Sequence, residues 1–124
     1  MGKIDENKKM KKEALFASAF KLFTEKGVNN TSISEIVKGA SMAKGTFYLY
    51  FKDKFDIHDR LIEYQSNKIF EIADEELNKA DCKSLEECVI FIADNIIGQL
   101  EKNPALLKFI SKNLSWAVFS NIRI

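Results

Sequence analysis

The sequence predicts an all-α fold, and three observations support this prediction. The chain of 124 residues is 46% hydrophobic, which is too apolar for extended disorder. It has one proline and five glycines, too few for the many tight turns of a sandwich or barrel of short strands. Apolar residues recur at helical spacing, beginning with Phe16, Phe20 and Phe23 at positions i, i+4 and i+7. The length suits one domain, or one domain and part of a second.

Six helices are expected from the apolar periodicity and from the residues that begin and end helices. Three begin with a capping box, in which a Ser or Asp and an acidic residue three positions later cap the first turn; these pairs are Ser32 with Glu35, Asp53 with Asp56, and Ser84 with Glu87. Gly27 can take the left-handed conformation that closes a helix, and Pro104 disfavours helical geometry at Asn103. The expected spans are about 10–26, 32–39, 43–51, 53–77, 84–102, and 104 through Leu114 to Ala117 or Val118.

The net charge of +1 is distributed unevenly along the chain. Residues 1–60 hold 12 Lys and Arg against 8 Asp and Glu, a net of +4, whereas residues 61–124 hold 7 against 10, a net of −3. A cationic half joined to an anionic half indicates a polyanion-binding head on a body with another task. Ordinary scatter of surface charge is the alternative. No stretch is apolar enough for a membrane span or a signal core, so we expect a cytoplasmic protein without membrane contact.

Few residues in the chain could support catalysis or metal binding. With one histidine, no cluster of metal ligands and no GxSxG or GxGxxG motif, the sequence favours a protein that is not an enzyme and needs neither cofactor nor metal. Cys82 and Cys88 are too few and too close for a disulfide framework. Both are expected to be reduced, with Cys88 packed as a small hydrophobic residue.

The two short helices over 32–51, preceded by an amphipathic helix, form a helix-turn-helix unit, whose second helix can lie in the DNA major groove. Phe47 and Phe51 anchor one face of that second helix. The other faces carry residues that suit phosphates and bases, namely Lys44, Thr46, Tyr48 and Tyr50. Gly45 lets the backbone come close to a duplex, and Lys54 lies at a helix N-terminus, which favours a phosphate.

Three segments, 14–27, 31–36 and 44–54, resemble in order and spacing the DNA-binding domain of the tetracycline-repressor (TetR) family. The resemblance covers about residues 13–60. It implies that the helix over 43–51 is the recognition helix. It further implies that operator DNA is contacted by Thr31 or Ser32 and by Lys44, Gly45, Thr46, Tyr48, Tyr50 and Lys54. Two positions depart from the family pattern: Ser41 stands at the usual turn glycine, and Ala43 at the usual serine cap. Ser41 could then cap the recognition helix, or the helix could begin a residue late.

The resemblance also implies how the whole protein is organised. Residues 1–58 would form the DNA-binding domain, and residues 59–124 part of a helical ligand-binding and dimerisation domain. The implied function is that of a ligand-responsive repressor, which binds a palindromic operator as a homodimer and is released by a small-molecule inducer. Family members usually continue for several more helices, so a fragment or truncated product is expected. The alternative is a truncated helical protein–protein interaction module with a vestigial helix-turn-helix.

Overall fold

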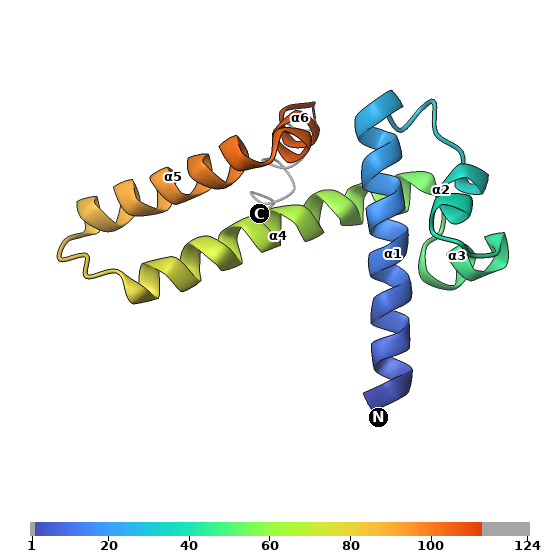
Figure 1. Ribbon diagram of the computed structural model, residues 1–124, viewed down its shortest axis with the longest axis horizontal. Helices are drawn as coiled ribbons and strands as arrows, with labels where there is room; N and C mark the ends of the chain where they lie inside the picture. The colour runs from blue at the N-terminus through green and yellow to red at the C-terminus, as the bar shows by residue number, and fades with distance from the viewer. Residues whose placement is uncertain (1, 113–124) are drawn as a thin grey trace. The chain divides into compact units, whose positions relative to one another are not determined.

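The computed structural model describes residues 2–112, which form six helices and no strand (Figure 1). The helices are α1 (Gly2–Lys26), α2 (Ile33–Gly39), α3 (Lys44–Tyr50), α4 (Lys54–Lys79), α5 (Leu85–Lys102) and α6 (Pro104–Lys112). The all-α prediction is therefore confirmed over this range. The chain divides into two compact units, Met1–Leu61 and Ile62–Ile124, and α4 runs from the first into the second.

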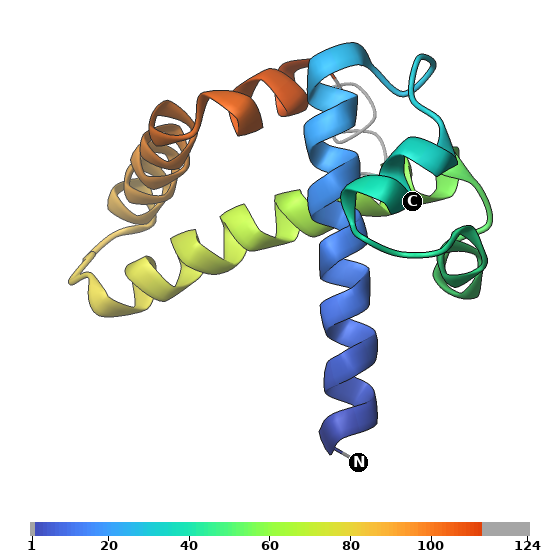
Figure 2. The ribbon, with the colours of Figure 1, turned by 45° about the vertical axis from the view of Figure 1, so that its right-hand side comes forward.

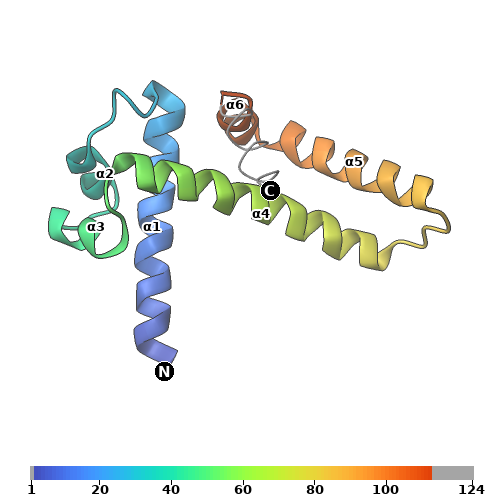
Figure 3. The same cartoon turned by 180° about the vertical axis from the view of Figure 1, so that it is seen from behind.

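Helix α1 begins eight residues earlier than expected. The apolar periodicity predicts a start at Met10, but the helix starts at Gly2. Residues 6–11 are exposed, so this extension needs no buried face, and the Glu, Lys and Met residues in it are good helix formers. Figures 2 and 3 show the N-terminal half of α1 extending beyond α2 and α3. The helix ends as predicted, because Gly27 has a φ of 80° and its N–H donates to the Phe23 carbonyl.

An aromatic cluster forms the centre of the first unit. As predicted, Phe47 and Phe51 of the recognition helix point inward and are almost fully buried. The Phe51 ring lies 5.4 Å from the Phe16 ring and 5.6 Å from the Phe47 ring, which ties α3 to α1. The buried apolar residues of this unit are Leu15, Phe16, Ala19, Phe23, Ile36, Val37, Phe47, Phe51, Ile57 and Leu61. This core fixes the orientation of the two short helices.

The turn between α2 and α3 is a Schellman motif with Ser41 in the left-handed conformation. Ser41 has a φ of 57°, its N–H donates to the Lys38 carbonyl, and the Met42 N–H donates to the Val37 carbonyl at 2.8 Å. These bonds satisfy carbonyls that the end of a helix leaves unpaired. Because a side chain is disfavoured in this conformation, Ser41 carries a strain that the usual glycine avoids.

Helix α3 begins at Lys44, one residue later than expected, and its N-cap is Ala43. No side chain caps this helix, so the option that Ser41 does so is wrong. The N-cap carbonyl still accepts from the Thr46 N–H at 3.0 Å. The recognition helix therefore depends on its buried phenylalanines rather than on its cap.

In the second unit, α4 and α5 run antiparallel, as Figures 1 and 3 show. The Gln99 side chain joins them by donating to the Ile69 carbonyl at 3.0 Å. Helix α5 begins at the predicted cap, where Ser84 Oγ accepts from the Glu87 N–H, yet none of its residues is fully buried. In α6, Leu106 and Phe109 are buried. The expected continuation through Leu114 to Ala117 or Val118 lies outside the described residues.

The prediction that both cysteines are reduced is wrong in this structure. Cys82 and Cys88 form a disulfide, and Cys88 is half-exposed rather than packed in a core. The connection between α4 and α5 brings their Cα atoms to 5.6 Å, which is within the range that a disulfide spans. Sequence spacing alone did not indicate this approach, because it depends on how the chain enters α5.

Candidate nucleic-acid interface

Three helix starts in the first unit meet at one shallow, open groove. Ser32 comes from the cap of α2, Lys44 from the start of α3 and Lys54 from the start of α4. The lining residues are Asn29, Asn30, Thr31, Ser32, Ile33, Ser34, Glu35, Lys44, Asp53, Lys54 and Phe55. The groove thus gathers four of the predicted site residues: Thr31, Ser32, Lys44 and Lys54. Ammonium and hydroxyl groups both donate hydrogen bonds to phosphate oxygens.

The remaining predicted residues lie along α3. The side chains of Lys44 and Tyr48 are exposed, and those of Thr46 and Tyr50 are partly exposed. The Tyr48 ring makes an edge-to-face contact with buried Phe47, with centroids 5.4 Å apart, so packing within α3 restrains the ring. The surface of α3 opposite the core is therefore open to a partner.

Gly45 is exposed in the first turn of α3, and a Cβ built there would meet no other atom within 4 Å. Gly39 is different, because a Cβ there would collide with Ser18 Oγ, which donates to the Ile36 carbonyl at 2.7 Å. Gly39 thus serves helix packing, whereas no contact among the described residues requires a glycine at position 45.

The family resemblance implies a DNA contact from Thr31 or Ser32 at the start of α2, and these two residues differ in accessibility. Thr31 is only 2% exposed, and its hydroxyl donates to the Gly27 carbonyl at 2.8 Å. Ser32 is exposed, although its Oγ accepts from the Glu35 N–H and caps the helix. Of the two side chains, only Ser32 faces solvent.

The capping glutamate of α2 also pairs with α1. The Glu35 carboxylate accepts from Lys26 Nζ, from the Ser32 N–H at 3.0 Å and from the Ser32 hydroxyl. The hydrogen bond from Lys26, followed by that from the Ser32 backbone, lowers the pKa of Glu35. This carboxylate therefore stays ionised and fixes α2 against the end of α1.

Lys54 has a structural role that its position in the sequence did not reveal. Its Nζ donates to the carbonyl oxygens of Asn29 at 3.2 Å and Thr31 at 3.1 Å. These residues belong to the loop between α1 and α2, more than twenty positions away in the chain. An ammonium group has three N–H donors, so these bonds use two of them.

Sequence reasoning missed Leu49. This side chain is 79% exposed on α3, beside Tyr48, where an apolar residue gains nothing from the fold. Apolar side chains in the major groove contact the C5-methyl group of thymine. The signal that could have found it is the helical period itself, because Leu49 lies about half a turn from the inward-facing Phe47 and Phe51.

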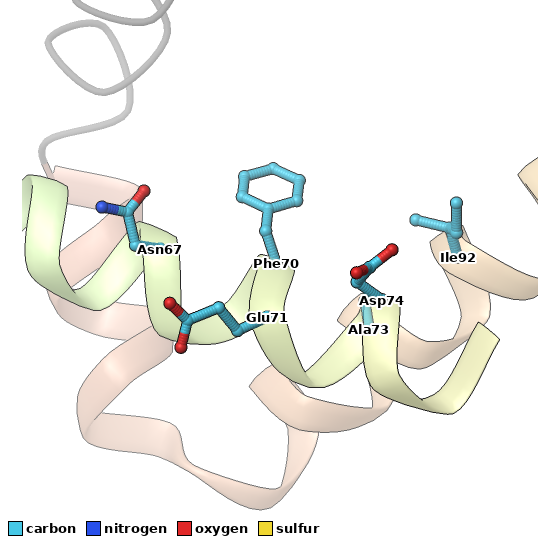
Figure 4. Close-up of a pocket in the computed structure, with 6 residues that line it drawn as sticks. All are labelled: Asn67, Phe70, Glu71, Ala73, Asp74 and Ile92. Carbon is cyan, nitrogen blue, oxygen red and sulfur yellow. The ribbon is translucent and has the colours of Figure 1, made fainter. Parts of the chain in front are cut away.

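The second unit has a separate hollow between α4 and α5. Figure 4 shows Phe70 projecting from α4 near Asp74, with Ile92 coming from α5. Asn67, Glu71 and Ala73 complete the lining. Over the described residues we find no helix long and apolar enough to cross a membrane, and no group of three potential metal ligands.

Comparisons with known proteins match the helix-turn-helix region and the fold around it. Residues 12–61 match the family model "Bacterial regulatory proteins, tetR family". A helix-turn-helix-type transcriptional regulator from Haemophilus influenzae is 30% identical over 112 residues, which cover 89% of this chain and 58% of that protein. The regulator AcrR from Shigella flexneri is 39% identical over 54 residues, 44% of this chain and 25% of that protein.

Solved structures agree with these sequence matches. A TetR-family regulator from Marinobacter aquaeolei superposes with a TM-score of 0.77 at 19% identity, covering 90% of this chain and 59% of that one, which shows the shared fold. A TetR-family regulator from Haemophilus influenzae gives 0.66 at 27% identity, covering 90% and 61%. The chain thus spans about three-fifths of these structures. Its residues 12–61, which contain the helix-turn-helix, belong to the tetR family of bacterial regulatory proteins.

Proposed function

We propose that the protein is a sequence-specific transcriptional repressor that binds a palindromic operator through α3. The observation that carries this proposal is the open surface of α3, where Lys44, Gly45 and Tyr48 are exposed while Phe47 and Phe51 anchor the opposite face. A short helix held in this way is the form in which a helix-turn-helix enters the major groove.

The contacts fall into two groups by chemistry. Ser32, Tyr48 and Lys54 bind phosphates, because hydroxyl and ammonium donors suit phosphate oxygens and carry no sequence information. Lys54 donates to a phosphate through the third N–H of its ammonium group, which is not bonded to the Asn29 and Thr31 carbonyls. Lys44, Thr46 and Leu49 read base edges, and Tyr50 lies beside them. Gly45 lets the α3 backbone approach the duplex. Thr31 acts by positioning the loop rather than by touching DNA, because its hydroxyl donates to the Gly27 carbonyl and its own carbonyl accepts from Lys54.

The protein acts as a homodimer, so that two recognition helices meet two half-sites about one DNA turn apart. Exposed apolar side chains in the second unit support burial against another surface; they include Phe70 and Ile72 of α4 and Val89, Ile90 and Ile97 of α5. A small-molecule inducer binds this unit, for which the hollow beside Phe70 is the candidate, and weakens operator binding. The protein has no enzymatic activity and works in the cytoplasm.

Selection of binding sites from a pool of random duplexes tests this function. The expected outcome is enrichment of one inverted repeat. Lys44→Ala or Thr46→Ala should change the enriched sequence, because both residues read bases. Tyr48→Phe should weaken binding to all sequences alike, because it removes only a phosphate donor. Failure to enrich any repeat would contradict the proposal, and equal effects of all three variants would contradict the division between reading and positioning residues.

A further inference from the structure

Cys82 and Cys88 lie where the backbone changes direction between the two long helices α4 and α5. Cys82 lies in the connection that follows α4, and Cys88 lies in the first turn of α5, where its N–H donates to the Ser84 carbonyl at 3.0 Å. Both side chains are partly exposed, so a dissolved reagent can reach them. The structure joins their sulfurs in a disulfide.

A disulfide here should stabilise the fold less than one that closes a long loop. The two cysteines are six positions apart, and the stabilisation from a cross-link falls as the loop that it closes becomes shorter. The segment is already held without it, because Ser84 Oγ accepts from the Glu87 N–H and the Glu87 carboxylate accepts from the Lys83 N–H at 2.8 Å. Helix α5 can therefore begin at the same residue whether or not the sulfurs are joined.

We propose that Cys82 and Cys88 form a reversible thiol-oxidation site that takes hydroperoxides as its oxidant. The inference rests on the proposed function in one respect: a DNA-binding protein works in the cytoplasm, where thiols are kept reduced and a disulfide is usually transient and redox-sensing. In the resting protein the pair is a dithiol, and the structure represents its oxidised form.

Oxidation of the two thiols to a disulfide needs only one molecule of hydroperoxide as the oxidant. One thiolate attacks an oxygen of the hydroperoxide, which breaks the O–O bond and gives a sulfenic acid and an alcohol, or water when the oxidant is hydrogen peroxide. The second thiol attacks the sulfenic sulfur, forms the S–S bond and releases water. The two sulfurs lose two electrons, and the two oxygen atoms of the peroxide take them up. Two molecules of reduced glutathione reverse the change by thiol–disulfide exchange.

The local consequence is a covalent link between the connection and α5. Helix α4 ends at Lys79 and is closed by the Ala80 N–H, which donates to the Glu76 and Leu77 carbonyls, so Cys82 is only three residues beyond the end of α4. Oxidation therefore restricts the positions that the end of α4 can take relative to the first turn of α5. Reduction releases this restriction and leaves the cap of α5 intact.

Thiol counting on the full chain tests the proposal. Fully reduced protein is treated with one equivalent of hydrogen peroxide, the remaining thiols are alkylated after denaturation, and the mass and cross-linked peptides are read by mass spectrometry. We expect both thiols to be lost together, with Cys82 joined to Cys88 within one chain, and both to return in excess reduced glutathione. In Cys82→Ser and Cys88→Ser the single remaining cysteine should instead stop at a sulfenic acid or pair between chains.

Two results would overturn the proposal. One is a reduced pair that peroxide leaves unchanged or converts only to cross-links between chains. The other is a disulfide that excess reduced glutathione does not open, which would make it a permanent structural link. The site selection described above is independent of this assay. A chain that selects no duplex yet cycles between dithiol and disulfide would contradict the DNA-binding function alone.

Discussion

Lys54 Nζ donates a hydrogen bond of 3.1 Å to the carbonyl oxygen of Thr31, and thereby joins the start of α4 to the loop that precedes α2. A lysine at this position looks from sequence like a free phosphate ligand. In the structure it is first a link between two segments more than twenty residues apart. The residue that we propose as a phosphate contact is therefore also part of what holds the helix-turn-helix together.

Lys54→Met should accordingly reduce both stability and DNA binding. Loss of two partly exposed, charge-assisted hydrogen bonds should lower the free energy of unfolding by about 1–2 kcal/mol. Loss of one phosphate contact should reduce the slope of log K against log salt by about 1. Chemical denaturation and titrations of labelled duplex measure the two effects. Lys21→Met, at an exposed position of α1, is the matched control. Unchanged stability in Lys54→Met would contradict the linking role.

Alanine substitutions at Gly39 and Gly45 should have opposite effects on stability. Gly45→Ala should raise stability by up to about 1 kcal/mol, because alanine is the better helix former and no atom obstructs its methyl group. It should weaken operator binding at least severalfold, because the methyl group lies on the DNA-facing surface. Gly39→Ala should lower stability by about 1–3 kcal/mol, because Ser18 must move and its hydrogen bond to Ile36 is then lost. Full operator affinity in a stable Gly45→Ala protein would exclude close backbone approach.

Ser41→Gly should stabilise the protein. Ser41 holds a φ of 57°, which costs an L side chain about 1 kcal/mol or more and costs glycine almost nothing. Part of this gain is offset by the greater entropy of glycine in the unfolded chain, so we expect a net gain of about 0.5–1 kcal/mol. Ser41→Ala, which keeps the Cβ and the strain, is the control and should show no gain. Equal stabilities of the glycine and alanine variants in urea titrations would show that the turn is not strained.

Stability should depend on pH through Glu35. The hydrogen bonds from Lys26 and the Ser32 backbone lower the pKa of Glu35 in the folded protein. The stabilising contribution is therefore present above the ordinary glutamate pKa of about 4.3 and is lost as pH falls through the folded value. Thermal melts at decreasing pH should show the Tm difference between the wild type and Glu35→Gln shrinking in acid. A difference that stays constant with pH would mean that ionisation of Glu35 does not stabilise the fold.

Asp56 also makes the stability of the fold depend on pH. Burial opposes ionisation of Asp56, but hydrogen bonds from the Lys52 N–H and the Arg60 side chain outweigh it, and its pKa is lowered. The loss of stability in acid therefore includes Asp56 as well as Glu35. Because Asp56 is present in both proteins, the difference between wild type and Glu35→Gln isolates Glu35.

Local signals were sufficient to predict the order of the helices and two of their caps. The inward positions of Phe47 and Phe51 follow from the helical repeat of 3.6 residues. The caps at Ser32 and Ser84 are indicated by the glutamate that follows each serine three positions later. The start of α1 was placed too late, because an exposed helix needs no apolar period. Helix propensity alone does not give such a boundary reliably.

The features that sequence could not give are long-range contacts. The bonds of Lys54 to Asn29 and Thr31, and the approach of Cys82 to Cys88, depend on how separate segments meet. The sequence does not distinguish Thr31 from Ser32, because both residue types cap helices, and only the folded loop turns the Thr31 hydroxyl inward. Leu49 was overlooked because its residue type suggests a core position, although its place in the helical period indicates the opposite.

Duplex binding across a salt series tests the central claim most directly. Fluorescence anisotropy would measure the affinity of the chain for the selected inverted repeat and for a shuffled duplex of equal length and composition. We predict that log K falls linearly with log salt, with a slope that reflects several phosphate contacts, at about 0.9 per phosphate. We also predict that the repeat binds at least a hundredfold more tightly than the shuffled duplex at every salt concentration. A flat salt dependence, or equal affinity for the two duplexes, would contradict DNA recognition by α3.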